Sequence, residues 1–397
     1  MWYSLVSYGM YLIFLLASPF HKKAKKWIAG RKNYFQELEK AIPPKDGKRV
    51  WVHCASLGEF EQVKPIMEKW LEANKDWNLI LTFFSPSGYE IRKKYELAAW
   101  VGYMALDTRS NASKYLDLIE PDMVLFVKYE FWYFHLTEVI KRKIPIYLIS
   151  ATFRKEHYIF KKIGRKTKRV LMQFSQIFLQ NQASYDLLKV AGFNNITVSG
   201  DTRYDRVLAQ ANMDVEIPKI EEWKDQQRTI VLGSSWSEEE NRMVAFLKQN
   251  KKFKVIVAPH DIGLAHIKKI ESLFSFTTCC KYSDIDLSTQ VLIIDSIGIL
   301  SKLYKYGDIA VIGGGFGRGL HNILEPMAFG LPTFFGNIHS KYPEAKKAVE
   351  EGVGFELKDS IDLPEGLPSK DEVKNYIKKH SGATVKVLEH INLGVTG

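Results

Sequence analysis

Short apolar runs alternate with longer segments of helical period along this chain, and the alternation occurs in two series. The first series has runs rich in β-branched and aromatic residues at positions 49–54, 78–84, 100–105, 123–127, 145–150, 176–179 and 196–199. The second series has runs at positions 229–232, 254–258, 291–294, 309–312 and 332–335. Strands that alternate with helices form a mostly parallel sheet covered on both faces. The pattern predicts an α/β chain with two doubly wound, Rossmann-like domains that face a cleft.

A polar stretch at residues 206–227 separates the two series and is expected to be a linker. The length of 397 residues accommodates two domains of ordinary size. We therefore expect one domain over residues 33–205 and a second over residues 228–369. Residues 370–397 begin with a helical pattern and are expected to pack back on the first domain.

Residues 1–32 depart from this globular pattern. Residues 1–20 carry no charge, and the basic side chains that follow are Lys22, Lys23, Lys25, Lys26, Arg31 and Lys32. A cleaved signal peptide has its positive charge before the apolar run, so this order predicts a membrane anchor with the following domains on the cytoplasmic side. A spanning helix and a helix that lies in one leaflet both fit. The basic flank is expected to contact anionic headgroups or an acceptor's phosphates.

The composition favours an anionic partner. The net charge is +11 and the pI is near 9.2, which suits nucleic acid, acidic lipid or phosphorylated substrates. No nucleic-acid-binding motif is present, and an apolar N-terminus does not fit that class. Three cysteines, at positions 54, 279 and 280, form no CxxC pair, so no structural disulfide is expected. The Asp284–Ile285–Asp286 triplet lies in a polar stretch and is interpreted as surface.

Two carboxylates follow strands of the first domain. Glu59 comes at the start of a helix, whose dipole is expected to keep it ionised and able to accept a proton. Ser56 and Glu59 also fit a helix capping box, and that alternative stays open. Glu130 lies among aromatic residues, which after a strand more often belong to a core than to a site. Arg203, near the domain junction, either meets a phosphate or pairs with Asp205.

Three loops of the second domain predict a nucleotide site. The stretch GGGFGRGLHNILEPMAFG, residues 313–330, follows a strand and places glycines, among them Gly313, Gly314 and Gly315, before a helix expected to begin near His321. Such a loop suits a phosphate, yet its spacing matches neither the dinucleotide motif nor a P-loop. Glu325 is expected to hold ribose hydroxyls. The other two loops supply Ser234 with Ser235, and His260, although helix caps and a structural histidine are the ordinary alternatives.

Taken together, these residues carry a family resemblance. The segments ASLGEFE (55–61), YEFW (129–132), GDTRYD (200–205), SSWSEE (234–239) and GG…HNILEP (313–326) occur in the order seen in the 3-deoxy-D-manno-octulosonic acid (Kdo) transferases of lipopolysaccharide synthesis. The resemblance covers nearly the whole chain, and ASLGEFEQ with HNILEP is its most specific part. It implies a GT-B fold and transfer of Kdo from CMP-Kdo, with inversion and without a bound metal, to a lipid A precursor at the cytoplasmic face of the inner membrane.

The resemblance also implies roles for single residues. Glu59 matches the general base, and Glu130 matches a second acidic position near the acceptor. Ser234, Ser235 and Gly313–Gly315 are then expected at the CMP phosphate, with Asn322 and Glu325 at the nucleotide and its ribose. The chain departs from the family at Trp236, where His is usual, and at His260, where Arg is usual. The resemblance therefore implies either that His260, Arg203 or helix dipoles carry more of the phosphate charge, or that the pocket is arranged differently.

Two other readings stay open at the sequence level. Another GT-B enzyme that uses a UDP-sugar on a lipid acceptor would share the fold and the role of Glu325. A catalytically silent scaffold is possible if Glu59 serves only as a helix cap.

Overall fold

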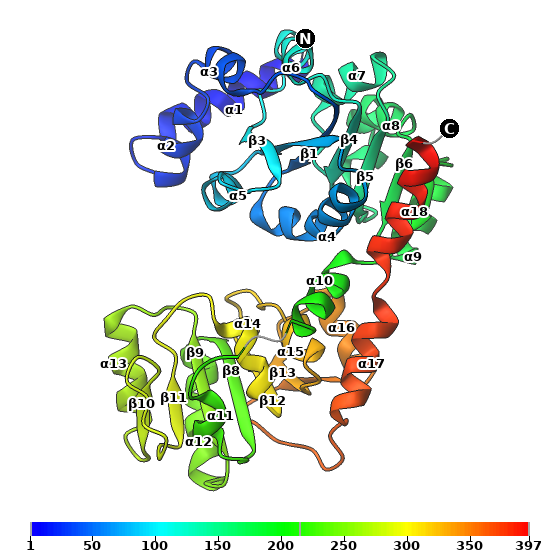
Figure 1. Cartoon of the computed structure of the whole chain (residues 1–397). Helices are drawn as coiled ribbons and strands as arrows, with labels where there is room; N and C mark the ends of the chain where they lie inside the picture. Colours follow the sequence, from blue (N-terminus) through cyan, green and yellow to red (C-terminus); the bar gives the residue numbers. More distant parts are fainter. Residues whose placement is uncertain (1, 214–215, 396–397) are drawn as a thin grey trace. The chain divides into compact units, whose positions relative to one another are not determined.

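The computed structural model describes residues 2–213 and 216–395, and the chain divides into two compact units. Unit 1 contains the chain up to Arg206 and again from Ser381, and unit 2 is Val207–His380. The chain therefore passes from one unit to the other twice (Figure 1). Each unit is described by itself.

Unit 1 is built on a seven-stranded parallel sheet with the strand order β3-β2-β1-β4-β5-β6-β7. Its strands are β1 (Lys48–Cys54), β2 (Trp77–Phe83), β3 (Ala98–Tyr103), β4 (Met123–Val127), β5 (Ile146–Ala151), β6 (Gln176–Leu179) and β7 (Ile196–Val198). All five residues of β4 are buried. A strand covered by helices on both faces has no polar side, which explains the continuous apolar runs of the sequence.

Helices cover both faces of this sheet. They are α4 (Leu57–Ala73), α5 (Pro86–Arg92), α6 (Arg109–Ile119), α7 (Tyr133–Lys141), α8 (Arg165–Leu171), α9 (Gln182–Val190), the start of α10 (Thr202–Ala211) and α18 (Ala383–Val395). One core includes Leu116 of α6 and Leu136 of α7. The other includes Phe60 of α4 and Val387 of α18. Helix α18 thus completes the core of unit 1, the unit that also contains the start of the chain.

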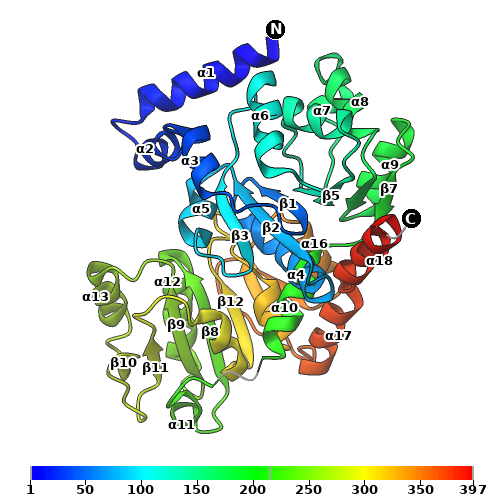
Figure 2. The same ribbon diagram turned by 45° about the horizontal axis from the view of Figure 1, so that its top comes forward.

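Three helices precede the sheet: α1 (Trp2–Ala17), α2 (Lys22–Ala29) and α3 (Tyr34–Ala41). In both views α1 and α2 lie side by side at one border of unit 1 (Figures 1 and 2). The Ser7 hydroxyl donates to the Asp107 carbonyl at 2.8 Å, so one side of α1 is docked. The other side exposes Val6 (65%), Ile13 (68%) and Leu16 (66%). None of the described helices has both the length and the apolarity that crossing a membrane requires.

Unit 2 repeats the architecture with a second seven-stranded parallel sheet, in the order β10-β11-β9-β8-β12-β13-β14. Its strands are β8 (Thr229–Ser235), β9 (Lys254–Pro259), β10 (Cys279–Lys281), β11 (Val291–Ile293), β12 (Ile309–Ile312), β13 (Thr333–Gly336) and β14 (Gly354–Leu357). Its helices are α11 (Ile220–Lys224), α12 (Ser237–Gln249), α13 (Leu264–Leu273), α14 (Leu300–Leu303), α15 (Leu324–Ala328), α16 (Pro343–Glu350) and α17 (Lys370–His380). The predicted pair of doubly wound sheets is confirmed.

The structure differs from the sequence expectation in three places. The expected linker, residues 206–227, carries the rest of α10 and all of α11, whose Ile220 and Trp223 are buried, while residues 214–215 lie outside the described part. Helix α15 begins at Leu324, one turn later than expected. The final segment is two helices, with the chain crossing from unit 2 to unit 1 between them.

Candidate active site

In each sheet the strand order reverses at one place, between β1 and β4 in unit 1 and between β8 and β12 in unit 2. Open parallel sheets bind ligands outside the carboxyl ends of the strands at such a reversal. Glu59 and Glu130 follow β1 and β4, and Ser235 and Gly313 stand at the ends of β8 and β12. The sequence-predicted residues therefore occupy the reversal point of each unit.

Glu59 lies at the third position of α4 and is only 6% exposed. Its Oε2 accepts a hydrogen bond from the backbone N–H of Ala55 at 2.5 Å. Ser56, the residue before the helix, makes no side-chain capping bond. The reciprocal capping box is therefore incomplete, and Glu59 is held by the turn that connects β1 to α4.

Burial, followed by the negative charge of Glu130, raises the pKa of Glu59 to about 7, even though the Ala55 N–H and the Lys128 ammonium act to lower it. The sequence had predicted a carboxylate kept ionised by the helix dipole. In the structure the loss of hydration outweighs the dipole, because removing a carboxylate from water disfavours its charged form. Near pH 7 such a group exchanges protons readily.

Glu130 and Lys128 come from the loop after β4. Glu130 is half-buried, and this burial raises its pKa as well. Lys128 has a left-handed backbone, with φ of 61°. Sequence reasoning passed over Lys128, although it is the charged residue between an apolar strand and Glu130.

A buried hydrogen-bonded pair, Asp107 and His135, supports this loop. Asp107 accepts from the backbone N–H groups of Phe134 and His135 and from His135 Nδ1, the last at 2.7 Å. Both side chains are fully buried. The first turn of α7, directly after Glu130, is thereby fixed to the segment that follows β3.

The backbone of the glycine loop in unit 2 packs closely against the backbone of neighbouring loops. A side chain at Gly313 would overlap the backbone of Ser234, and one at Gly315 would overlap the backbone of Gly336. Gly314, Gly317 and Gly319 have positive φ. The sequence had predicted that these glycines leave room for a ligand. The structure shows that neighbouring loops fill the space at the first and third glycine.

A buried carboxylate joins two of the predicted phosphate-binding loops. Glu239 of α12 accepts from the backbone N–H of Gly314 at 3.0 Å and from that of Trp236 at 3.0 Å. The neighbouring Ser235 hydroxyl donates to Glu240 at 3.0 Å, and Glu240 also contacts His266 at 2.8 Å. Burial raises the pKa of Glu239. These two N–H groups and the Ser235 hydroxyl therefore already have acceptors within the protein.

Aromatic rings from three loops stack at the same end of the sheet. Trp236 follows β8, and its ring stacks on that of His260, which follows β9, with centroids 4.5 Å apart. His260 in turn lies 4.7 Å from His321, which follows β12. The guanidinium carbon of Arg318 lies 4.9 Å from the centre of the Trp236 ring. The structure thus brings His260 and the glycine loop together, as predicted, and adds Trp236 and Arg318.

Among the remaining residues predicted to bind the donor, Asn322, Glu325 and Arg203 have partners in the structure. Asn322 donates from Nδ2 to Glu325 at 2.9 Å and accepts from the backbone N–H of Leu324, the first residue of α15. Arg203 belongs to unit 1 and pairs with Asp201 at 2.6 Å. Ser234 is half-buried in a left-handed conformation, with φ of 51°.

The basic flank divides into exposed and buried members. Lys22, Lys23, Lys25 and Lys26 are exposed. Arg31 is 9% exposed and lies against the rings of Trp27, Phe84 and Tyr103. Burial lowers its pKa to about 9. The prediction that Arg31 faces a membrane is therefore corrected, because its guanidinium is packed inside unit 1.

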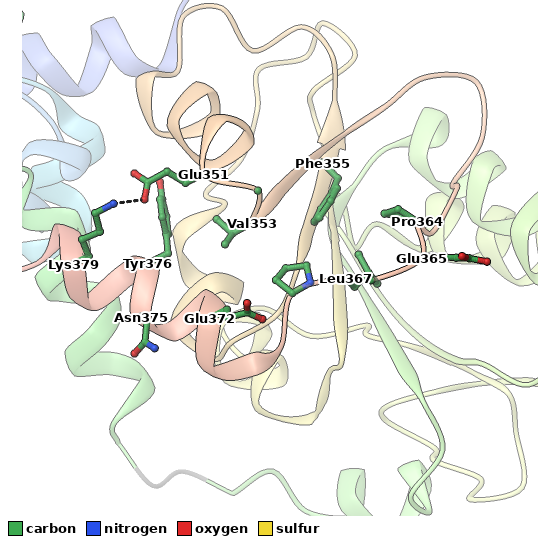
Figure 3. A pocket seen from close by; sticks show the side chains of 13 residues that line it. Glu351, Val353, Phe355, Pro364, Glu365, Leu367, Glu372, Asn375, Tyr376 and Lys379 are labelled. Carbon is green, nitrogen blue, oxygen red and sulfur yellow. Dashed lines mark hydrogen bonds and ion pairs between the residues drawn. The ribbon is translucent and has the colours of Figure 1, made fainter.

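A separate cavity of about 740 Å³ lies elsewhere in unit 2. Phe355 of β14, Tyr376 and Lys379 of α17 and Leu367 of the loop between them line it, and Glu351 pairs with Lys379 at its edge (Figure 3). No residue of the glycine loop or of the ring stack lines this cavity. Across the described residues, no group of three or more His, Cys, Asp and Glu side chains is placed to hold a metal ion.

Comparison with known proteins gives the same family as the sequence motifs. Residues 29–206 match the family model described as 3-Deoxy-D-manno-octulosonic-acid transferase (kdotransferase). The chain is 29% identical to the 3-deoxy-D-manno-octulosonic acid transferase of Aquifex aeolicus over 87% of this chain and 93% of that protein. It is 27% identical to the 3-deoxy-D-manno-octulosonic acid transferase of Chlamydia muridarum, over 95% of this chain and 93% of that protein.

Solved structures show the fold. The UDP-GlcNAc 2-epimerase of Neisseria meningitidis superimposes with a TM-score of 0.58 at 16% identity, over 87% of this chain and 99% of that one. MurG of Acinetobacter baumannii superimposes with a TM-score of 0.53 at 12% identity, over 87% and 99%. With two parallel seven-stranded sheets, the fold is GT-B. The chain is a GT-B glycosyltransferase related to the 3-deoxy-D-manno-octulosonic acid transferases.

Proposed function

We propose that this protein transfers Kdo from CMP-Kdo to a lipid A precursor, with inversion at the anomeric carbon and Glu59 as the general base. The observation that carries the proposal is the raised pKa of Glu59, about 7, at the reversal point of the first sheet. The choice of Kdo as the transferred sugar is supported by the names of the matching family and relatives. CMP-Kdo is the donor that this resemblance implies.

The proposed reaction is a direct displacement at the anomeric carbon of Kdo. The acceptor hydroxyl attacks the anomeric carbon of Kdo while its proton passes to Glu59. A bond forms between the acceptor oxygen and the anomeric carbon, and the bond from that carbon to the phosphate oxygen breaks. CMP leaves with the electron pair, and its negative charge requires donors already in place. A base with a pKa near 7 combines a substantial ionised fraction with enough basicity to take the proton.

Glu130 and Lys128 adjust this base. The charge of Glu130 makes Glu59 more basic, and the charge of Lys128 makes it less so. Glu130 is proposed to lie beside the acceptor. No metal is assigned to the reaction, since donors and cations of the protein would balance the phosphate.

We place the protein at the inner membrane, with both units on the cytoplasmic side and α1 lying in the surface of the bilayer. One face of α1 is docked through Ser7, and the other exposes apolar side chains at helical spacing. Lys22, Lys23, Lys25 and Lys26 follow directly. Apolar insertion combined with basic side chains is the usual basis of such binding.

The test is a transfer assay with freshly generated CMP-Kdo and tetraacylated lipid A precursor, read by mass spectrometry. Wild-type protein is expected to give a product heavier by one or more Kdo units, and the folded Glu59→Gln variant to give none. Product from both proteins would remove Glu59 as the base and keep the reaction. No product with intact donor would favour a UDP-sugar, which thermal protection by UDP rather than CMP would then support.

A further inference from the structure

At the end of the unit 2 sheet where the glycine loop lies, few of the backbone N–H groups that the structure describes are free to bind a phosphate. A phosphate at a glycine loop is ordinarily held by free N–H groups and by a helix N-terminus. Here Glu239 already accepts from Gly314 and Trp236. The first turn of α12 also carries Glu238 and Glu240, so the positive end of that helix is compensated. A phosphate that binds here is repelled by these carboxylates unless a basic side chain supplies a compensating positive charge.

The nearby basic side chains differ in their availability. Burial lowers the pKa of His321, and the neighbouring His260 lowers it further, so neutral His321 is favoured. Arg242 contacts the ring of Phe316, but it donates to the backbone carbonyls of Lys358 and Glu238. Arg318 is exposed and has no carboxylate partner among the described residues. The Arg318 guanidinium is therefore the positive group at this end of the sheet that is available to bind a phosphate.

Trp236 holds that guanidinium in place. A guanidinium over an indole face keeps its N–H groups, which lie in the guanidinium plane, free for a second partner. The same indole stacks on His260. The ring therefore connects the loop after β9 to the glycine loop after β12.

We propose that Arg318, supported on Trp236, is the cation that binds the phosphate of the nucleotide donor in this protein. The inference rests on the proposed function, because it assumes a nucleotide at this end of the sheet. It also accounts for Trp236 in this chain, because the flat ring at position 236 supports the Arg318 guanidinium.

The probe is CMP, with cytidine as the neutral comparison, titrated calorimetrically into the full-length protein. The Arg318→Ala variant is expected to bind CMP roughly 10- to 100-fold more weakly, the loss that follows removal of a charged hydrogen-bonding partner. Its affinity for cytidine is expected to stay unchanged. Arg242→Ala, which removes the same charge beside the same loop, is the matched control and is expected to keep its affinity for CMP.

A second variant tests the placement of the charge. Because His260 stacks on Trp236, an arginine at position 260 reaches the same ring. Adding His260→Arg to Arg318→Ala is therefore expected to restore much of the affinity for CMP. Equal CMP affinity in wild type and Arg318→Ala would overturn the inference and leave the proposed function intact. Absence of CMP binding by the wild type would count against the proposed function itself.

Discussion

The protonated form of Glu59 favours folding, whereas the proposed reaction requires the ionised form. Its pKa of about 7 lies above the ordinary value of 4.5, so the folded protein binds the proton more tightly than the unfolded chain. The stability it contributes is fully present below pH 4.5 and is lost as the pH rises through 7. The ionised form that destabilises unit 1 is the form that the proposed reaction needs to take the acceptor's proton.

The first prediction concerns the pH dependence of kcat/KM. Because the carboxylate is the active form, kcat/KM is expected to rise tenfold per pH unit below about pH 7 and to level off above it. Glu130→Gln removes a like charge, so its acidic limb is expected to move to lower pH. Lys128→Met removes a cation, so its limb is expected to move to higher pH. The measurement is a pH series of initial rates for the three proteins.

Lys141→Met serves as the control for this series, because Lys141 is an exposed lysine of the same unit. Its acidic limb is expected to coincide with that of the wild type. Shifts of the Glu130→Gln and Lys128→Met limbs in the same direction would contradict the electrostatic coupling of these residues to Glu59.

At the scale of the element, α1 is a mainly apolar helix with one face already docked on unit 1. Its 16 residues measure about 24 Å, less than the roughly 30 Å of a bilayer's hydrocarbon core. The exposed residues Val6, Ile13 and Leu16 are spaced by seven and by three and therefore share a face of the helix. This exposed face is the one that we propose to lie in the surface of the bilayer.

The second prediction tests that face with the double substitution Ile13→Asp and Leu16→Asp. Both side chains are about two-thirds exposed, so folding is expected to be preserved. Each apolar group that no longer enters the bilayer forfeits about 1.5–3 kcal/mol, so binding to vesicles of anionic phospholipid is expected to fall at least tenfold. Co-sedimentation measures the bound fraction.

Leu264→Asp, at an exposed apolar position of unit 2, is the matched control and is expected to bind vesicles like the wild type. If the double variant binds normally in low salt and is released by high salt, Lys22, Lys23, Lys25 and Lys26 hold the protein to the membrane and α1 does not.

At the scale of the whole molecule, unit 1 is assembled from both ends of the chain. The buried residues Val387 and Ile391 of α18 belong to the core that lies under α4. Asp205 accepts from the backbone N–H groups of Gly382 and Thr384, which fixes the point where the chain returns. Unit 2 is one continuous segment between these two parts.

The third prediction follows from this arrangement. Val387→Asp places an unpaired carboxylate in the core of unit 1, at an expected cost of about 3 kcal/mol or more. Hydrogen exchange is expected to rise in β1, β4 and α4 and to stay unchanged in β8 and β12. Val385→Asp, at a half-exposed position of the same helix, is expected to leave both units protected. Equal loss of protection in the two units would contradict their independence.

The sequence predicted the strands at the centre of each sheet, because continuous apolar runs such as β4 and β12 leave little alternative. It missed β10 and β14, the edge strands of unit 2, which are short and partly exposed. It placed Glu59 and Glu130 at strand ends but gave the pKa shift of Glu59 the wrong direction, since burial is not visible in sequence. The contacts of Glu239 with Gly314 and of Arg318 with Trp236 join loops far apart in the chain, so local pattern could not reveal them.

The position of α18 at the end of the chain has a consequence for biosynthesis. Ribosomes extend a chain by roughly 5–20 residues per second, and domains commonly fold as they emerge. The sheet of unit 1 is translated first, but its closing helix follows only after all of unit 2. For roughly 10 to 40 s the nascent protein therefore exposes an apolar strip on the unit that carries Glu59. A transcript cut short anywhere in unit 2 would leave that strip uncovered for chaperones and proteases to recognise.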